Sequence, residues 1–381
     1  IYYMPSNNLL RVGIVGAGWA AEGHAFAYDR CAETITVAIC NRTQSTAEKV
    51  AQRYQIPNIF SDYQQMFQEN LDIVAITTPA HTHCQIAVDA LNAGAHVICE
   101  KPMTLNAEEA LKMYQVANKK NLKTAIAFNW RYTPEFMHLK KLIDDGHIGE
   151  VQEIHAHWLR GLPKEVAVGW FTRLEQGGGF LANGGAHEID RVRCLLGCEP
   201  KRVCGKTIHT LKHGYVVPDT NYFLDRLAWR PGKDEPLDNY QTEEITADMG
   251  YYFLADFGNS ESNKNETMAV FRSGSARGRG PRSIEVFGNN GSLVLEDNQL
   301  LGCPLDKQEF EPIYLPVNSS DLASNQLELL NYLWTEMVED FIRSIRQVET
   351  SVPTFYDGLK GQQVIDAVRL SGRENKWIQL T

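Results

Sequence analysis

A glycine-rich turn near the start of the chain has the residue types of a phosphate-binding loop. It reads Gly16-Ala-Gly18-Trp-Ala-Ala21 and lies between a strand-like apolar run and a helix-like pattern. In that setting Gly16 permits a tight turn, Gly18 lets a pyrophosphate approach the backbone, and Ala21 allows close packing of helix on strand. The helix start, with Trp19 and Ala20, would then offer N–H groups to the phosphates. The pattern predicts a dinucleotide-binding site.

The end of the second predicted strand bears on which dinucleotide is bound. NAD enzymes commonly have an acidic side chain there that accepts from the adenosine ribose, whereas this chain has Asn41 and Arg42. Asn41 can hydrogen-bond a ribose without repelling a 2′-phosphate, and Arg42 can pair with that phosphate. Both NAD and NADP therefore stay open as cofactors.

Lys101 and His187 stand where a side chain could act on a substrate. Lys101 precedes a proline at the carboxyl end of a predicted strand, the edge at which open α/β sheets bind ligands. A surface lysine in a turn is the alternative. His187 follows the glycine run 177–179 on a predicted helix, and imidazole exchanges a proton near neutral pH. A capping or core histidine is the alternative there.

The first 128 residues alternate short apolar runs with amphipathic helical patterns. This rhythm predicts βαβ units and a parallel sheet. The expected strands are 11–15, 35–40, 71–77, 96–100 and 123–128. The expected helices are 20–31, 45–54, 83–93 and 106–120. Residues 1–128 are thus predicted to form a dinucleotide-binding α/β domain.

The pattern changes after residue 128, so residues 129–381 are predicted to form a second α/β domain. Period-two alternation predicts strands at 150–160, 202–209, 247–257, 267–273, 283–287 and 292–296. Helices are expected at 134–145 and around His187. Two more are expected in the C-terminal segment 325–371, over 325–347 and 356–371. Residues 211–244 are rich in Pro, Asp, Gly and Asn and form a predicted insertion.

Length and charge restrict the class of protein. A chain of 381 residues exceeds one ordinary core and suits two domains. No run approaches the roughly 20 apolar residues of a membrane span, and a net charge of −10 argues against nucleic acid. An Arg-rich stretch is the local exception and is interpreted as a solvated loop or an anion-binding loop. Its members are Arg272, Arg277, Arg279 and Arg282.

The cysteines and paired histidines predict no metal site. Eight cysteines have no CxxC pair, which favours buried thiols in a reducing compartment, hence a cytoplasmic protein. Cys194 and Cys198 lack the second pair that zinc needs. His155 and His157 should share one strand face as surface or interface residues.

Five segments together make the chain similar to the Gfo/Idh/MocA family of oxidoreductases. They begin with Thr78-Pro79-x-x-x-His83 and Ala95-His-Val-Ile-Cys-Glu-Lys-Pro102. They continue with Asn129-x-Arg131-Tyr-x-Pro134 and Gly146-x-x-Gly149. The last, from Gly177 through His187 to Asp190, resembles the family's GGGxxxDxGxHxxD motif. The resemblance covers almost the whole chain.

The resemblance implies a Rossmann domain followed by an α/β domain with a large, open, mostly antiparallel sheet, which commonly forms homodimer or homotetramer contacts. It implies hydride transfer between nicotinamide and a secondary alcohol of a sugar, cyclitol or similar polyol. Lys101 would stabilise the developing alkoxide and His187 would take the hydroxyl proton. The residues expected at the cofactor include Thr78, Pro79, His83, Glu100 and Asn129. Trp170 is a candidate for the substrate pocket or for the core.

One position departs from the family's motif. Where the family has an aspartate four residues before the histidine, this chain has Asn183. An aspartate can orient the histidine or help to carry the proton, whereas asparagine can only hydrogen-bond. Three alternatives stay open: a working dehydrogenase in which His187 suffices, a member with altered chemistry such as an NAD-dependent glycosidase, and a dinucleotide-binding regulator or scaffold without turnover.

Overall fold

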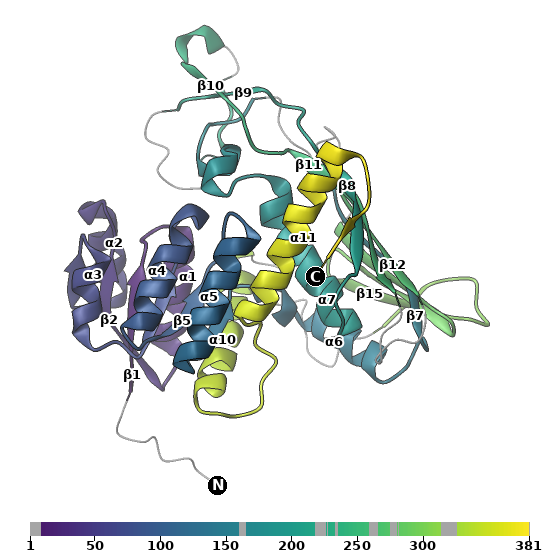
Figure 1. Ribbon diagram of the computed structural model, residues 1–381, viewed down its shortest axis with the longest axis horizontal. Coiled ribbons are helices and arrows are strands. Elements are labelled where there is room, and N and C mark those ends of the chain that lie inside the picture. Colours follow the sequence, from purple (N-terminus) through teal and green to yellow (C-terminus); the bar gives the residue numbers. More distant parts are fainter. Residues whose placement is uncertain are drawn as a thin grey trace. The chain divides into compact units, whose positions relative to one another are not determined.

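The chain forms two compact units in the computed structural model (Figure 1), which describes residues 9–159, 165–217, 226, 228–232, 235–258, 266–274, 280, 282–313 and 326–380. The first unit contains the described residues up to Asn129 together with those from 326 to Leu359. The second contains the described residues from Trp130 to 313 and from Lys360 onward.

A six-stranded parallel sheet is the centre of the first unit. Its strand order is β3-β2-β1-β4-β5-β6, so the order reverses between β1 and β4. The strands are β1 Leu10–Val15, β2 Thr34–Cys40, β3 Asn58–Phe60, β4 Ile73–Ile76, β5 His96–Cys99 and β6 Thr124–Ile126. All four residues of β4 are buried, as expected for a parallel sheet covered on both faces. The predicted Rossmann fold is confirmed, with β3 as a strand that the periodicity did not predict.

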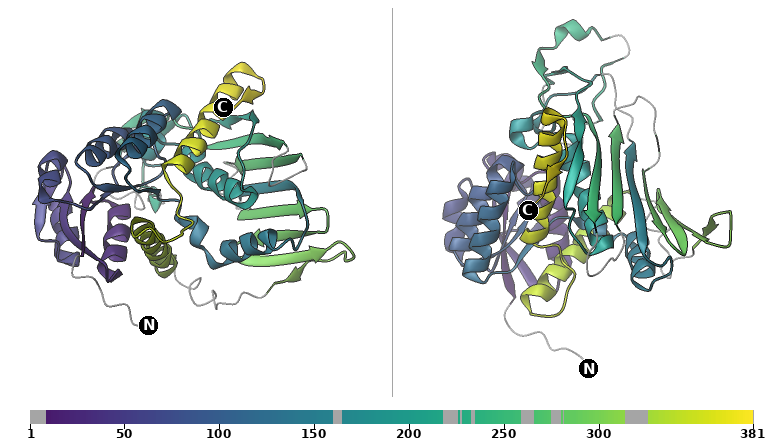
Figure 2. Two further views of the ribbon diagram at one scale, coloured as in Figure 1. Left: turned by 60° about the horizontal axis from the view of Figure 1, so that its bottom comes forward. Right: turned by 45° about the vertical axis from the view of Figure 1, so that its right-hand side comes forward.

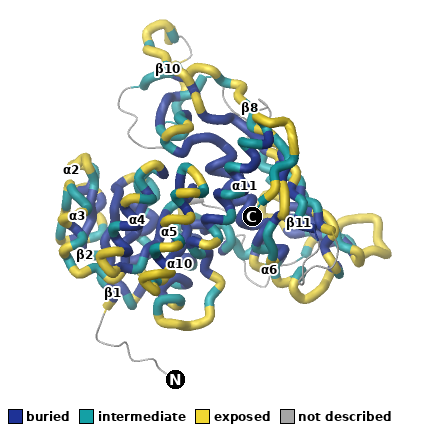
Figure 3. The backbone as a smooth tube through the Cα atoms, in the orientation of Figure 1, coloured by how far each residue is buried: buried dark blue, intermediate teal, exposed yellow. Residues whose placement is uncertain are grey.

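The helices of the first unit include one from near the C-terminus. They are α1 Trp19–Arg30, α2 Gln44–Tyr54, α3 Tyr63–Met66, α4 His83–Asn92, α5 Ala107–Lys120 and α10 Gln326–Ile345. Figure 3 shows that helices such as α4 and α5 carry both buried and exposed residues.

Helix α10 belongs to the first unit because it packs on α1. Trp334 of α10 is 2% exposed, and its ring meets the Trp19 ring edge-on with centroids 4.9 Å apart. Gly23 makes room, since a Cβ there would lie 2.2 Å from the Trp334 ring. This location differs from the expectation, which placed both C-terminal helices in the second domain. An apolar helix face does not specify from sequence which surface it will cover.

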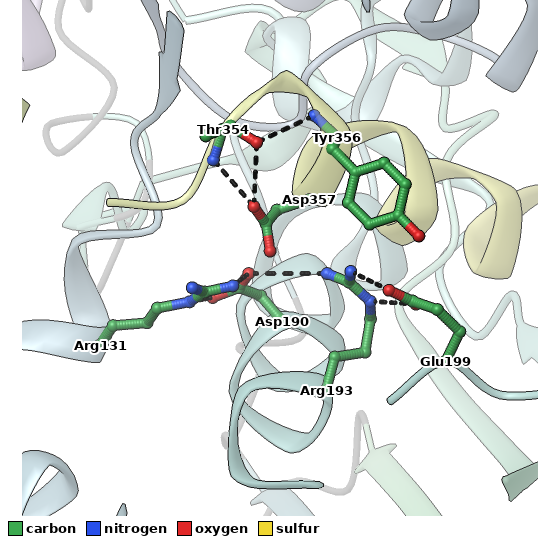
Figure 4. Close-up of polar contacts among 7 residues, drawn as sticks. All are labelled: Arg131, Asp190, Arg193, Glu199, Thr354, Tyr356 and Asp357. Carbon is green, nitrogen blue, oxygen red and sulfur yellow. Dashed lines mark hydrogen bonds and ion pairs between the residues drawn. The ribbon is translucent and has the colours of Figure 1, made fainter. Parts of the chain in front are cut away.

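The last long helix, α11 Phe355–Glu374, begins with a reciprocal cap. The carboxylate of Asp357 accepts from the Thr354 N–H at 2.8 Å, and the Thr354 hydroxyl accepts from the Tyr356 N–H at 3.2 Å. Figure 4 shows these bonds, which satisfy N–H groups that a helix start otherwise leaves without partners.

A nine-stranded mixed sheet dominates the second unit, in the order β16-β15-β14-β13-β7-β12-β11-β8-β17. Only the β7–β12 pair is parallel among these described strands. The strands are β7 Val151–Leu159, β8 Arg202–Ile208, β11 Gly250–Gly258, β12 Thr267–Gly274, β13 Arg282–Gly288, β14 Gly291–Glu296, β15 Gln299–Pro304, β16 Glu311–Pro312 and β17 Ile378–Gln379. The predicted open, mostly antiparallel sheet is confirmed.

The two faces of this sheet differ. Helices α6 Pro134–Asp144 and α7 Ala186–Leu196 lie on one face, as Figure 2 shows. Along β11 the side chains of Tyr251 and Phe253 are buried, whereas Tyr252 and Leu254 are 41% and 39% exposed. The alternation places the second pair on the opposite face, as period-two geometry requires.

The predicted insertion contains a small two-stranded sheet. It pairs β9 His213–Tyr215 with β10 Thr242–Glu244. The Tyr215 N–H donates to the Val166 carbonyl at 2.9 Å, and the Val168 N–H donates to the Tyr215 carbonyl at 2.8 Å. The insertion is therefore tied to the segment that leads to Trp170.

The structure also tests the expectations for the cysteines, the paired histidines and membrane spans. All eight cysteines are free thiols, but only Cys31, Cys40 and Cys99 are buried, so the expectation of buried thiols is wrong for the other five. The other five are half-exposed: four lie on helices or strands, and Cys198 lies in the bend after α7. His155 and His157 do share one face, with ring centroids 5.7 Å apart. No described helix has the length and apolarity needed to cross a membrane.

Candidate active site

The cofactor turn lies at the carboxyl end of β1, beside the point where strand order reverses. Gly16 adopts a φ of 110°, and a Cβ there would lie 2.4 Å from the Thr77 hydroxyl oxygen. A Cβ at Gly18, in contrast, would meet no atom within 4 Å. Ala21 is fully buried. The tight turn, the open approach and the packed helix each have the residue that they require, so the turn fits a pyrophosphate.

The residues expected to select the cofactor follow β2. The Asn41 amide nitrogen donates to the Thr43 carbonyl at 2.9 Å, which leaves its oxygen able to accept from a ribose hydroxyl. Arg42 is exposed. Its side chain can therefore swing toward a 2′-phosphate or remain in solvent.

Thr78, Pro79 and His83 follow β4 on the same edge of the sheet. The ring of His83 is buried, with Nε2 2.6 Å from the Thr78 carbonyl oxygen and Nδ1 3.1 Å from that of Pro102. Burial lowers the pKa of His83, while its bond to Thr78 and the charge of Glu100 oppose the change. His83 thus joins the loops after β4 and β5, and its predicted contact with the cofactor would be indirect.

Glu100 and Lys101 follow β5 on this edge. The Glu100 Oε2 accepts from the Lys101 backbone N–H at 3.2 Å. Burial lowers the pKa of the Lys101 ammonium, and the Glu100 carboxylate opposes the change. The cis peptide Lys101–Pro102 ends the segment. Asn129, 6% exposed, follows β6. The first unit therefore gathers the predicted cofactor residues on one edge.

In the second unit, Asn183 lies in a π-helical turn, Leu181–Gly185, directly before α7. Its amide nitrogen donates to the carbonyls of Gly179 at 2.8 Å and Gly177 at 3.3 Å. Gly179 adopts a φ of 102°, which strongly favours glycine. Asn183 therefore holds the glycine run closed through two donor bonds that an ionised carboxylate could not make.

His187 is the second residue of α7 and is 4% exposed. Its ring packs against Trp130, with centroids 5.4 Å apart, and Trp130 contacts Trp158 at 5.5 Å. Gly184 admits the Trp158 ring, because a Cβ there would lie 2.2 Å from it. Two tryptophans from different segments thus define the orientation of the histidine.

Arg282 completes this cluster and corrects the interpretation of the Arg-rich stretch. Its guanidinium lies over the Trp130 ring at 3.1 Å from the centroid and pairs with Glu188 at 3.2 Å. Glu188, 1% exposed, also pairs with Arg191 at 3.4 Å. Arg282 is therefore neither a solvated loop residue nor free for an anion, because β13 carries it into the sheet's helix-covered side. Arg277 and Arg279 lie outside the described residues.

Asp190, one turn after His187, anchors α7. It accepts two bonds from Arg131, at 2.7 and 2.5 Å, and Arg193 lies 4.0 Å away and pairs with Glu199 at 2.6 Å (Figure 4). Bidentate pairs of this kind combine strength with fixed geometry. The HxxD part of the motif thus has a structural reason in this chain.

Trp170 begins a short 3₁₀ turn, Trp170–Thr172, and is half-buried. Its ring meets Phe171 edge-on at 5.9 Å, while the Gly179 N–H donates to the Phe171 carbonyl at 2.9 Å. Trp170 therefore lies beside the glycine run, and its contact with substrate stays a prediction.

Sequence reasoning missed several residues of these clusters. They are Trp130, Glu188, the ring-stacking Arg282, and the buried His24 of α1, whose Nε2 lies 3.3 Å from Glu100 Oε1. Trp130 lies within the Asn129-x-Arg131 segment, so its place inside a motif could have indicated a role at the site. Glu188 had a signal in its place directly after His187, but nothing in the sequence indicates its partner.

Comparisons with known proteins identify the family to which the chain belongs. Residues 10–128 match the profile described as an oxidoreductase family with an NAD-binding Rossmann fold, and residues 136–294 match the Gfo/Idh/MocA C-terminal domain. The chain belongs to the Gfo/Idh/MocA family. It is accordingly an oxidoreductase that binds NAD.

Relatives of this Gfo/Idh/MocA protein include named sugar dehydrogenases. Levoglucosan dehydrogenase of Pseudarthrobacter phenanthrenivorans is 25% identical over 97% of this chain and 98% of that protein. D-glucoside 3-dehydrogenase of Escherichia coli is 34% identical over 49% of this chain and 54% of that protein. A solved levoglucosan dehydrogenase with NADH and L-sorbose has a TM-score of 0.82 at 22% identity and covers 98% and 99% of the two chains. The last likeness shows the fold.

Proposed function

We propose that the chain oxidises a secondary alcohol of a sugar, cyclitol or similar polyol and that the reaction is reversible. The observation that carries the proposal is the place of Lys101, which follows β5 on the sheet edge that holds the Gly16 to Gly18 turn. The named activities of the relatives support the substrate class. When bound, NAD supplies the carbon that accepts the hydride.

Lys101 and His187 are assigned complementary roles. A carbinol releases hydride only as its hydroxyl proton leaves, so a base that works near neutral pH is needed, and His187 is proposed for it. The Lys101 ammonium stabilises the oxygen charge that develops. Lys101 is half-buried, and an ammonium partly shielded from water interacts more strongly with an alkoxide than one in open solvent.

The test is a panel of polyols and aldoses, offered with NAD and with NADP and read by the nicotinamide absorbance. Lys101→Ala should abolish turnover while cofactor binding stays measurable by fluorescence. His187→Ala should lower kcat by roughly 10²–10⁴ at neutral pH. Matched controls are Lys119→Ala on α5 and His147→Ala after α6, both exposed.

Distinct outcomes would overturn the proposal. Full turnover by Lys101→Ala would remove the assigned chemistry. Sugar release from glycosides without net NADH would indicate a glycosidase that uses NAD transiently. Tight NAD binding with no reaction across the panel would indicate a dinucleotide-binding regulator or scaffold that has lost catalysis, with Asn183 in place of the family's aspartate.

A homodimer or homotetramer is proposed through the open face of the nine-stranded sheet. Exposed Tyr252 and Leu254 on β11 support it, since apolar side chains that the described residues leave exposed on a sheet face suit an interface. Analytical ultracentrifugation should give a mass greater than that of one chain, and Leu254→Glu should lower it. A single-chain mass for the unaltered protein would refute the proposed oligomer.

A cytoplasmic location is proposed as well. The eight free thiols support it.

A further inference from the structure

A buried histidine on the cofactor helix reaches the carboxylate that precedes the catalytic lysine. His24 lies on α1 and is fully buried. Its Nε2 lies 3.3 Å from Glu100 Oε1, across 76 positions of sequence. Lys101 takes the other carboxylate oxygen through its backbone N–H at 3.2 Å. One carboxylate therefore connects α1 to Lys101.

The surroundings of this carboxylate are specific. Besides His24 and Lys101, the titratable groups close to Glu100 are His83 from α4 and the neighbouring thiol of Cys99. His24 itself faces Tyr28, with ring centroids 6.4 Å apart. Among the described residues, His24 Nδ1 has no hydrogen-bond partner, so the contact with Glu100 is its polar anchor.

The charges of His24, Glu100 and Lys101 affect one another. Burial alone would raise the pKa of Glu100, but the bond and charge of His24, followed by Lys101, lower it overall. The ionised Glu100 in turn opposes the loss of charge that burial imposes on Lys101. A buried carboxylate without a donor is costly, because desolvation disfavours its charged form.

We propose that His24 is a positioning residue for Lys101: its Nε2–H fixes the ionised Glu100 carboxylate, which keeps the Lys101 side chain an ammonium. The proposal rests on the role of Lys101 given above. Because α1 also starts at the pyrophosphate turn, His24 connects the cofactor helix, through Glu100, to the residue that stabilises the alkoxide.

Loss of the His24 donor should lower the pH at which Lys101 releases its proton. Without it, Oε1 loses its imidazole donor while the Glu100 side chain is only 13% exposed, and Glu100 either takes up a proton or turns away. Lys101 then loses its counter-charge and releases its proton at a lower pH. At neutral pH more of the lysine is neutral, so alkoxide stabilisation falls and kcat falls with it, while KM changes little.

The experiment measures the lysine directly and needs no substrate. The NAD-loaded protein is treated with a trace amount of acetic anhydride between pH 6 and 10, and acetylation of Lys101 is quantified by mass spectrometry. Only the neutral amine reacts. In His24→Leu the midpoint of the Lys101 curve should move down by about one pH unit, which raises labelling at pH 7 roughly tenfold.

Matched variants separate this role from simple packing. In His24→Gln the amide nitrogen can reach the position of Nε2, so the wild-type curve should largely return. Tyr28→Phe alters the same buried region without touching Glu100 and should leave the curve unchanged. Should His24→Leu not fold, Glu100→Gln provides the same test by removing the charge, and its curve should also move down.

The proposal fails if the Lys101 curve is the same in wild type, His24→Leu and Glu100→Gln, or if Tyr28→Phe shifts it as much as His24→Leu. A shifted curve in a protein that oxidises no polyol would uphold the His24 contact and refute the proposed reaction. The two failures are therefore distinguishable.

Discussion

The guanidinium of Arg282 lies 3.1 Å from the centroid of the Trp130 ring, and that ring packs against His187. Arg282 is held there by Glu188 at 3.2 Å. The orientation of the candidate base thus depends on an ion pair between the buried Glu188 and the half-buried Arg282, which are 94 positions apart. Cation–π contact and ion pair act on the same side chain, so removing it should affect both stability and turnover.

Arg282→Met should destabilise the protein by about 3 kcal/mol, because it leaves Glu188 buried with one partner fewer. Urea unfolding measures this change. In parallel, kcat should fall more than KM rises, since the Trp130 ring loses its support. Arg202→Met is the control: Arg202 pairs with Asp256 at 2.8 Å but is 45% exposed, so about 1 kcal/mol or less is expected. Equal losses in the two variants would contradict the prediction.

Asn183→Asp should destabilise the second unit rather than restore a missing catalytic acid. The new carboxylate would face the carbonyls of Gly177 and Gly179, which now accept from the amide. The expected cost is about 1–3 kcal/mol at pH 7. It should shrink toward pH 4, where the introduced group is protonated and can donate.

Unfolding of Asn183→Asp at both pH values measures this. Asn118→Asp on the exposed face of α5 is the control, with a change of about 0.5 kcal/mol or less. A variant as stable as wild type and faster on polyols would show that the glycine run adapts to a carboxylate.

Asp248 should make stability depend on pH. It is 1% exposed, and burial raises its pKa although the Leu181 N–H donates to it at 2.9 Å. A carboxyl group with a raised folded-state pKa stabilises the fold below its unfolded pKa of about 3.9, and this contribution is lost as pH rises through the folded value.

Asp248→Asn should therefore gain in stability relative to wild type as pH rises from 4 to 8. The measurement is the free energy of unfolding of both proteins across that range. Asp238→Asn, at an exposed site, should run parallel to wild type. A difference between Asp248→Asn and wild type that stays constant with pH would rule out the raised pKa.

Cofactor preference should respond to the pair after β2. Arg42→Ala should weaken NADP binding roughly tenfold, about 1.4 kcal/mol, and leave NAD binding unchanged, because the guanidinium is proposed to pair with the 2′-phosphate, which NAD lacks. Asn41→Asp should weaken NADP binding further by like-charge repulsion. Fluorescence titration with both dinucleotides decides. If Arg42→Ala leaves NADP affinity unchanged, Arg42 has no such role.

Much of the first unit could be predicted from sequence because its signals are local. The Gly16 to Ala21 turn, the apolar strands and Lys101 at a strand end each lie within a few residues of what they need. In a parallel sheet, strand ends meet at one edge, so local placement was enough to assemble the predicted cofactor residues there.

The sequence by itself determined the family, the two α/β domains and the positions of Lys101, His187 and Asn183. Only the tertiary structure decided that α10 returns to α1, that Arg282 stacks on Trp130, and that His24 reaches Glu100. The reason is physical: periodicity reports which face of an element is buried, but buried charges and aromatic rings choose partners by geometry across long loops, and no local pattern encodes that choice.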